Sequence, residues 1–190
     1  VRSATEVTSV YYDRVKFLYD YRDEMTGVST GFTDLDRILG GMQNSDFLII
    51  AGRPGRGKTS FMLSVALHAI KIDRKRVAVF SLEMSNDQLA SRLIAQETHI
   101  DSQRLRQGKL KEDEWSSFTE AVEMISNTQL FMDDTPAISA LQLRTKCRRL
   151  HSEAKLDLII VDYLQLMTAD SRIESRVQEV SYISRSLKLL

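Results

Sequence analysis

The chain has 190 residues, and its 26 basic and 26 acidic side chains give no formal net charge. This balance excludes a protein that coats nucleic acid over its whole surface, but it is compatible with a local basic loop or with basic groups inside a ring. The single cysteine excludes an internal disulfide framework, and the sequence has no signal peptide and no apolar run long enough to span a bilayer. We therefore expect a soluble, cytoplasmic protein with no membrane partner, whose length fits one domain with a sizeable core.

The first predicted element is a lone helix over residues 1–24, where apolar side chains recur at helical spacing. Periodicity alone leaves open whether the apolar side of this helix folds back on the domain or docks on another subunit. In the connector that follows, Thr33 is expected to cap a short helix over residues 34–39. Asp36 and Arg37, within that short helix, are expected to be solvated.

The most specific pattern in the chain lies between residues 47 and 70. An apolar run over residues 47–51 predicts a strand, an amphipathic pattern predicts a helix, and the loop between them has the form G-x-x-x-x-G-K-[ST]. In such a loop, successive N–H groups and the helix N-terminus surround a phosphate, the lysine reaches the β- and γ-phosphates, and the threonine hydroxyl is a ligand for Mg²⁺. The motif predicts a site for ATP and Mg²⁺, without indicating what hydrolysis drives. The predicted nucleotide-binding residues are Gly52, Arg53, Pro54, Gly55, Arg56, Gly57, Lys58, Thr59 and Ser60.

Three further apolar runs alternate with helical patterns along the rest of the chain. The strands are expected at residues 76–82, 129–132 and 156–161, and the helices after Asn86, after Asp101, over 111–126, after Ser139 and from about 174 to 190. This alternation predicts an α/β fold, with a mostly parallel sheet flanked by helices. In such sheets ligands bind at the carboxyl ends of the strands.

Carboxylates stand at those strand ends. Asp162 closes an apolar run, which is the arrangement that holds Mg²⁺ opposite the threonine of the loop, so Thr59 and Asp162 are the predicted metal ligands. Because Tyr163 follows Asp162, the group that orients the attacking water must come from elsewhere, and Glu83 is the candidate. The alternative for Glu83 is a helix-capping acid. Asp133 is expected to make structural hydrogen bonds in its loop.

Five strings occur in order along the chain: TGFTDLD, RPGRGKT, SLEMS, DDTP and DYLQLM. Together they resemble the C-terminal motor domain of DnaB-family replicative DNA helicases, which has a RecA-like fold, over nearly the whole chain. The resemblance implies a homohexameric ring that hydrolyses ATP at subunit interfaces, moves along single-stranded DNA and unwinds duplex DNA. It also implies work at the replication fork in the cytoplasm, with primase and a helicase loader as partners.

The resemblance assigns roles to single residues. Glu83 matches the family's catalytic glutamate, and Lys58 of the glycine-rich loop is the second predicted catalytic residue. Arg172, Glu174 and Arg176 match a loop that faces the central channel and touches the DNA backbone, with a solvated loop as the alternative. The resemblance also divides the chain into a linker helix, residues 1–27, which docks on a neighbouring subunit, and an ATPase core, residues 28–190.

The chain also departs from the family pattern. Gly55 and Arg56 replace a small residue followed by methionine, and the arginine finger, the later strands and the domain that meets primase would lie outside this chain. We therefore expect a motor fragment with weak activity of its own. The rival interpretations are a RecA-like recombinase or clock-type ATPase that does not unwind DNA, and a small-molecule phosphotransferase, which would need an acceptor pocket and a lid. The SLEMS and DYLQLM strings favour the helicase.

Overall fold

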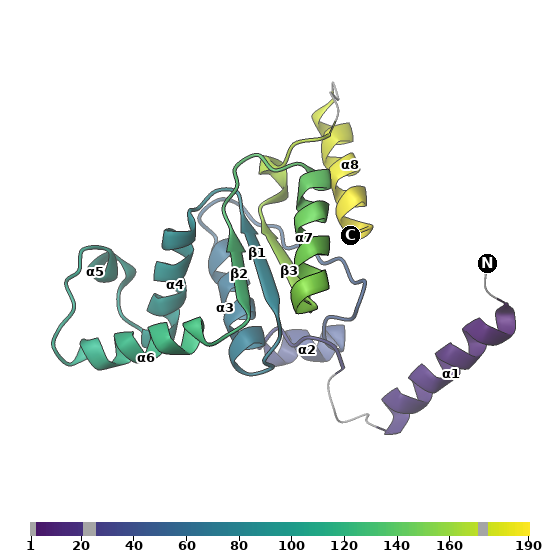
Figure 1. Cartoon of the computed structure of the whole chain (residues 1–190), viewed down its shortest axis with the longest axis horizontal. Helices are drawn as coiled ribbons and strands as arrows, with labels where there is room; N and C mark the ends of the chain where they lie inside the picture. Colours follow the sequence, from purple (N-terminus) through teal and green to yellow (C-terminus); the bar gives the residue numbers. More distant parts are fainter. Residues whose placement is uncertain (1–2, 21–25, 171–174) are drawn as a thin grey trace.

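The computed structural model describes residues 3–20, 26–170 and 175–190, and it has an α/β architecture (Figure 1). Its sheet has three parallel strands in the order β2-β1-β3. The strands are β1 (Val77–Ser81), β2 (Leu130–Asp133) and β3 (Leu158–Asp162). The three later strands that the sequence predicts are therefore present, and they pair in parallel as expected.

Helices precede, connect and follow these strands. They are α1 (Ala4–Asp20), α2 (Thr33–Leu39), α3 (Lys58–Lys71), α4 (Asn86–Thr98), α5 (Ser102–Arg106), α6 (Glu114–Ser126), α7 (Ala140–Ala154), the short 3-10 helix η1 (Leu164–Leu166) and α8 (Arg176–Lys188). Within the part of the chain that the structure describes, every helix is too short or too polar to cross a bilayer.

The core has one layer on each face of the sheet. Val77 and Val79 of β1 pack in a cluster with side chains of α3 and α4, whereas Ala78 and Phe80 pack in a second cluster with α7 and α8. Alternate residues of a strand point to opposite faces, so the central strand β1 is buried at every position. Figure 1 shows α3 and α4 on one side of the sheet and α7 and α8 on the other.

Cys147 of α7 lies in the second core cluster. Burial, with a smaller effect of the Asp133 charge, raises the pKa of its thiol to about 12. The thiol is therefore protonated near neutral pH, as suits a small apolar core residue.

The predicted strand over residues 47–51 is wrong. This segment has no strand structure, and Leu48, Ile49 and Ile50 are exposed, with Ile49 at 68%. Residues of this segment and of β3 line the same cavity, but the segment makes no ladder with that strand. Apolar, β-branched residues pack well on a pleated, half-buried surface, which is why this composition predicted a strand. A strand forms only where a neighbouring strand pairs with it.

Helix starts follow capping chemistry, with two corrections. Asp101 caps α5 and Ser139 caps α7, as expected, because each accepts hydrogen bonds from the first turn. The cap of α4 is Ser85 rather than Asn86, and Ser85 forms a reciprocal capping box with Gln88. The expectation that Thr33 caps α2 is also wrong, because Thr33 is the first residue of that helix.

The predicted N-terminal helix is present as α1. Its apolar side chains, including Val7, Val10, Tyr11 and Val15, are exposed. In Figure 1 α1 lies away from the sheet and the helices that flank it. The apolar side of α1 is therefore available as a docking surface.

Candidate nucleotide-binding site

The loop between residues 51 and 58 joins an extended segment to the start of α3. Gly55 and Gly57 have φ angles of 74° and 86°, a left-handed conformation that favours glycine. The Lys58 ammonium donates a hydrogen bond to the Gly52 carbonyl at 3.0 Å, so the lysine side chain folds back across the loop. The loop is exposed and ends at the helix N-terminus, where free N–H groups and the helix dipole favour an anion.

Thr59 and Asp162 lie in direct contact. The Thr59 hydroxyl donates a hydrogen bond to Asp162 Oδ2 at 2.7 Å, although the two residues are 103 positions apart in the chain. Asp162 ends β3 and is only 6% exposed. The fold therefore places a hydroxyl oxygen of α3 beside a carboxylate oxygen of β3, and hard oxygen ligands of this kind suit Mg²⁺.

The residues around Glu83 are tied to the same edge of the sheet. Ser81 pairs with Asp162 in the parallel ladder, and the Leu82 N–H donates to the Asp162 carbonyl at 2.7 Å. The buried Ser81 hydroxyl accepts the Met84 N–H at 3.0 Å, which closes a turn around Glu83. Glu83 itself is exposed, and it lines the same cavity as the loop glycines, Lys58, Thr59 and Asp162.

Glu83 does not have the capping role that was its alternative, because Ser85 caps α4. The structure thus brings Lys58, Thr59, Glu83 and Asp162 to one cavity. Sequence reasoning missed the part of Ser81 in this arrangement. The available signal was a serine that ends a strand of otherwise apolar residues.

Asp133 has the structural role expected of it. Its carboxylate accepts hydrogen bonds from the Lys146 ammonium at 2.5 Å and from the Thr135 N–H at 2.9 Å. Burial acts to raise the pKa of Asp133, but the hydrogen bonds from Lys146 and Thr135 outweigh it and hold that pKa below its usual value. The Asp133 carboxylate therefore holds its own loop and ties it to α7.

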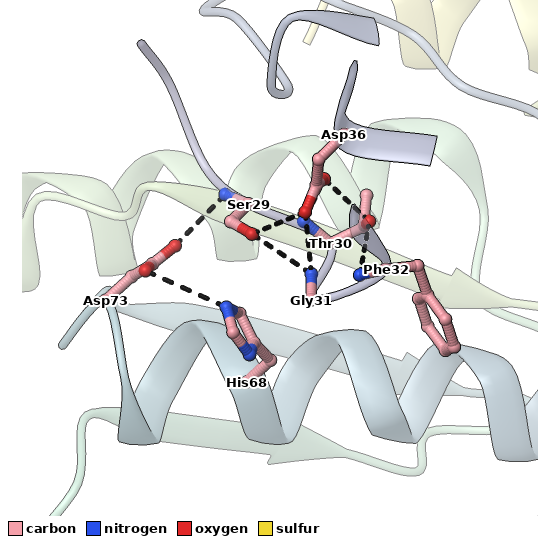
Figure 2. Close-up of polar contacts among 7 residues, drawn as sticks. All are labelled: Ser29, Thr30, Gly31, Phe32, Asp36, His68 and Asp73. Carbon is pink, nitrogen blue, oxygen red and sulfur yellow. Dashed lines mark hydrogen bonds and ion pairs between the residues drawn. The ribbon is translucent and has the colours of Figure 1, made fainter. Parts of the chain in front are cut away.

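Sequence reasoning placed Asp36 in solvent, and this prediction is wrong. Asp36 is 5% exposed, and its carboxylate accepts hydrogen bonds from the Ser29 hydroxyl, from the Thr30 N–H and hydroxyl, each at 2.7 Å, and from the Gly31 N–H at 3.2 Å (Figure 2). The connector curls over the start of α2, so its polar groups need an acceptor there. Burial acts to raise the pKa of Asp36, but hydrogen bonds from Thr30, Ser29 and Gly31 hold it below its usual value.

A sequence comparison decides the family. The family described as "DnaB-like helicase C terminal domain" matches residues 27–190. The chain belongs to this family.

Similar proteins agree with that assignment. The replicative DNA helicase DnaB of Geobacillus stearothermophilus is 47% identical over 180 residues, which are 94% of this chain and 40% of that protein. The DnaB of Synechocystis is 49% identical over 164 residues, 85% of this chain and 19% of that protein. This chain therefore spans less than half the length of these relatives.

Solved structures confirm the fold of this DnaB-like domain. The ATPase domain of G40P matches with a TM-score of 0.91 and 29% identity over all of this chain and 66% of that one. A DnaB-like replicative helicase, described with its interactions with primase, matches with a TM-score of 0.86 and 29% identity, over all of this chain and 45% of that one.

Only one of the three residues predicted to contact DNA is among the described residues of this DnaB-like domain. Arg172 and Glu174 are outside the described residues, whereas Arg176 begins α8. The Arg176 guanidinium pairs with Glu179 at 2.5 Å and donates a hydrogen bond to the Gln165 carbonyl. Arg176 could contact DNA only if its guanidinium left these partners or used N–H groups that they do not occupy.

Proposed function

We propose that this chain is the ATP-hydrolysing motor of a replicative DNA helicase, which couples hydrolysis to movement on single-stranded DNA and to duplex unwinding. The observation that carries the proposal is the Thr59–Asp162 hydrogen bond of 2.7 Å, made beside a loop of the P-loop form. The similarity to replicative helicases supports the choice of helicase over a recombinase, a clock-type ATPase or a phosphotransferase.

In this proposal the loop residues Gly52 to Ser60 hold the triphosphate. The loop N–H groups and the N-terminus of α3 bind phosphate oxygens, and the Lys58 ammonium leaves the Gly52 carbonyl for the β- and γ-phosphates. The lysine exchanges a neutral carbonyl acceptor for anionic phosphate oxygens, which favours the bound state. Arg56 adds a further cation at the loop.

The residues present also fit Mg²⁺. Thr59 and Asp162 would hold it, since Mg²⁺ binds through hydroxyl and carboxylate oxygens together with phosphates and water. Bound there, the ion would neutralise charge on the phosphates during transfer. Glu83 would orient the attacking water and accept its proton, a role that requires a carboxylate within hydrogen-bond reach of that water.

The proposed assembly is a homohexameric ring at the replication fork in the cytoplasm. Residues 1–27 would form a linker whose helix docks on a neighbouring subunit, and residues 28–190 would form the ATPase core. The exposed apolar side chains of α1 support this docking. Primase and a helicase loader are proposed partners, and the similarity to a helicase described with its primase interactions supports the first of them.

The test uses the whole protein that carries this chain. ATP hydrolysis is measured with and without single-stranded DNA, and unwinding is measured on a forked duplex. We expect DNA to stimulate hydrolysis and ATP to drive unwinding, because the proposed motor couples the two. Lys58→Ala should lose nucleotide binding or turnover, and Glu83→Gln should keep ATP binding while losing hydrolysis by about 100-fold or more.

Two outcomes would contradict parts of this proposal. Transfer of phosphate to a nucleoside without DNA-stimulated hydrolysis would show a phosphotransferase. Normal hydrolysis by Glu83→Gln would show that another group orients the water, and would leave the nucleotide site itself intact.

A further inference from the structure

The segment from Ser29 to Phe32, which we call the strap, runs along α3. Beyond the C-terminal end of α3, the Asp73 carboxylate accepts the Ser29 N–H at 3.0 Å. In the last turns of the helix, Gly31 packs against His68. Near the first turn, the Phe32 ring stacks on the Phe61 ring, with a centroid distance of 4.9 Å. The strap therefore contacts both ends of the helix that begins with Lys58 and Thr59. Figure 2 shows its course along that helix past His68 and Asp73.

Gly31 sets how closely the strap approaches the helix. Its φ angle is 82°, and a Cβ on this residue would lie 2.6 Å from His68 Cγ. His68 Nε2 also lies 3.9 Å from Asp73 Oδ1, so the two residues that contact Gly31 and Ser29 of the strap are themselves neighbours. The strap thus lies directly on the helix, with no space for a side chain between them.

Asp36 gives the strap its shape. Its carboxylate accepts hydrogen bonds from Ser29, Thr30 and Gly31, and the Ser29 and Thr30 hydroxyls in turn accept the N–H groups of Gly31 and Phe32 at 3.0 and 3.2 Å. Every residue of the strap is therefore held by this one buried group or by a hydroxyl bonded to it. Without the carboxylate, the Thr30 N–H would be left buried with no partner in the described structure.

We propose that Asp36 is a positioning residue for the nucleotide site: it shapes the strap, and the strap fixes α3 where Lys58 and Thr59 meet the triphosphate. The inference rests on the proposed ATP site at the Gly52–Ser60 loop. Phe61 connects the strap to the first turn of α3. Its ring lies against Phe32, and its N–H donates to the Gly57 carbonyl at 2.9 Å. Displacement of Phe61 therefore shifts the turn that carries the two ligand residues.

The test is the dissociation constant for Mg²⁺-ATP, measured by calorimetry on the whole protein that carries this chain, at a temperature where each variant is fully folded. We expect Asp36→Ala to weaken binding about tenfold or more, since a misplacement of about 1 Å can cost up to about 100-fold. Asp36→Asn should fall between the wild type and Asp36→Ala, because its amide oxygen still accepts the Thr30 N–H. The matched control is Asp34→Ala in the same helix, whose side chain is 90% exposed, and it should bind like the wild type.

A second variant keeps the test decisive if Asp36→Ala does not fold. Phe32→Ala removes the ring from a partly exposed position and leaves the carboxylate network intact. We expect it to fold and to weaken ATP binding several-fold. Unchanged ATP affinity in both Phe32→Ala and the folded Asp36 variants would overturn the proposal and leave Asp36 with a role in stability alone.

The controls separate this proposal from the proposed function. If the wild-type chain and Lys58→Ala both fail to bind ATP, the nucleotide site itself is wrong. If the wild type binds, Lys58→Ala does not, and the strap variants match the wild type, only the positioning role fails.

Discussion

Two buried aspartates bear on α3, Asp162 directly through Thr59 and Asp36 indirectly through the strap, and they differ in how much of their hydrogen-bonding capacity the chain uses. Asp36 accepts hydrogen bonds from three successive residues of the strap, so its carboxylate is saturated. Among the described residues, Asp162 accepts a side-chain hydrogen bond only from Thr59. Both are about equally buried, at 5% and 6% exposure.

The difference teaches how a structural carboxylate can be told from one with a chemical role. A carboxylate has two oxygens with about four acceptor positions. When the chain fills them, the group stabilises a local fold and has nothing left for a ligand. When the chain fills only one acceptor position and a cavity faces the others, the protein buries a charge that folding alone does not need. Burial by itself separates the two cases poorly.

The largest expected effect is that of substituting Asp162, and it tests whether this residue differs from Asp36 in having a chemical role. Asp162→Asn keeps the shape of the side chain and an acceptor for the Thr59 hydroxyl, but it removes the charge that suits Mg²⁺. We expect ATP turnover to fall about 100-fold and the Mg²⁺ concentration for half-maximal activity to rise about tenfold or more. The measurement is a Mg²⁺ titration of ATPase rate in the whole protein. An unchanged Mg²⁺ dependence would show that Asp162, like Asp36, is structural.

A smaller effect concerns Ser81, which shapes the turn around Glu83. Ser81→Ala removes the acceptor for the Met84 N–H, so the turn loosens. We expect kcat to fall about tenfold while the dissociation constant for ATP stays at the wild-type value, because the Ser81 hydroxyl holds the turn around Glu83 and has no hydrogen bond to the loop among the described residues. Single-turnover kinetics and calorimetry separate the two quantities. Ser116→Ala on the exposed surface of α6 is the control, and equal kcat values in the two variants would contradict the prediction.

The smallest effect concerns acid stability and Asp36. Its pKa is lowered in the folded protein, so its contribution to stability is present above the unfolded pKa of about 3.9 and is lost as pH falls through the folded value. Asp36→Asn cannot ionise. At pH 7 the wild type should be more stable by about 1–3 kcal/mol, and this difference should shrink below about pH 4.

Urea unfolding of both proteins at pH 7 and pH 3 measures that difference. Other carboxylates with lowered pKa values, such as Asp133 and Asp157, are present in both proteins and cancel. A stability difference that is the same at both pH values would show that the Asp36 charge does not stabilise the strap.

Sequence alone predicted the parts of the fold that depend on local pattern. The strands around Val79 and Ile160, the helix after the glycine loop, and the caps at Asp101 and Ser139 all follow from apolar runs or capping chemistry. The meeting of Thr59 with Asp162 followed from the P-loop motif, in which an aspartate at the end of a strand lies opposite the threonine of the loop.

The rest depends on contacts that no local pattern contains. The run over residues 47–51 has the composition of a strand but no paired neighbour, so composition misled. Asp36 sits in a polar stretch that is typical of a solvated helix, and only the curl of the strap buries it. The role of Ser81 depends in the same way on how the turn after β1 folds back on its own strand.

Cys147 has a practical consequence for site-specific labelling of this chain. It is the only cysteine in the sequence, and its buried thiol stays protonated at the pH of maleimide chemistry. A second cysteine at exposed Asp34 would therefore react alone, with no background substitution needed. A dye attached there would lie two residues before Asp36, on the helix that holds the strap.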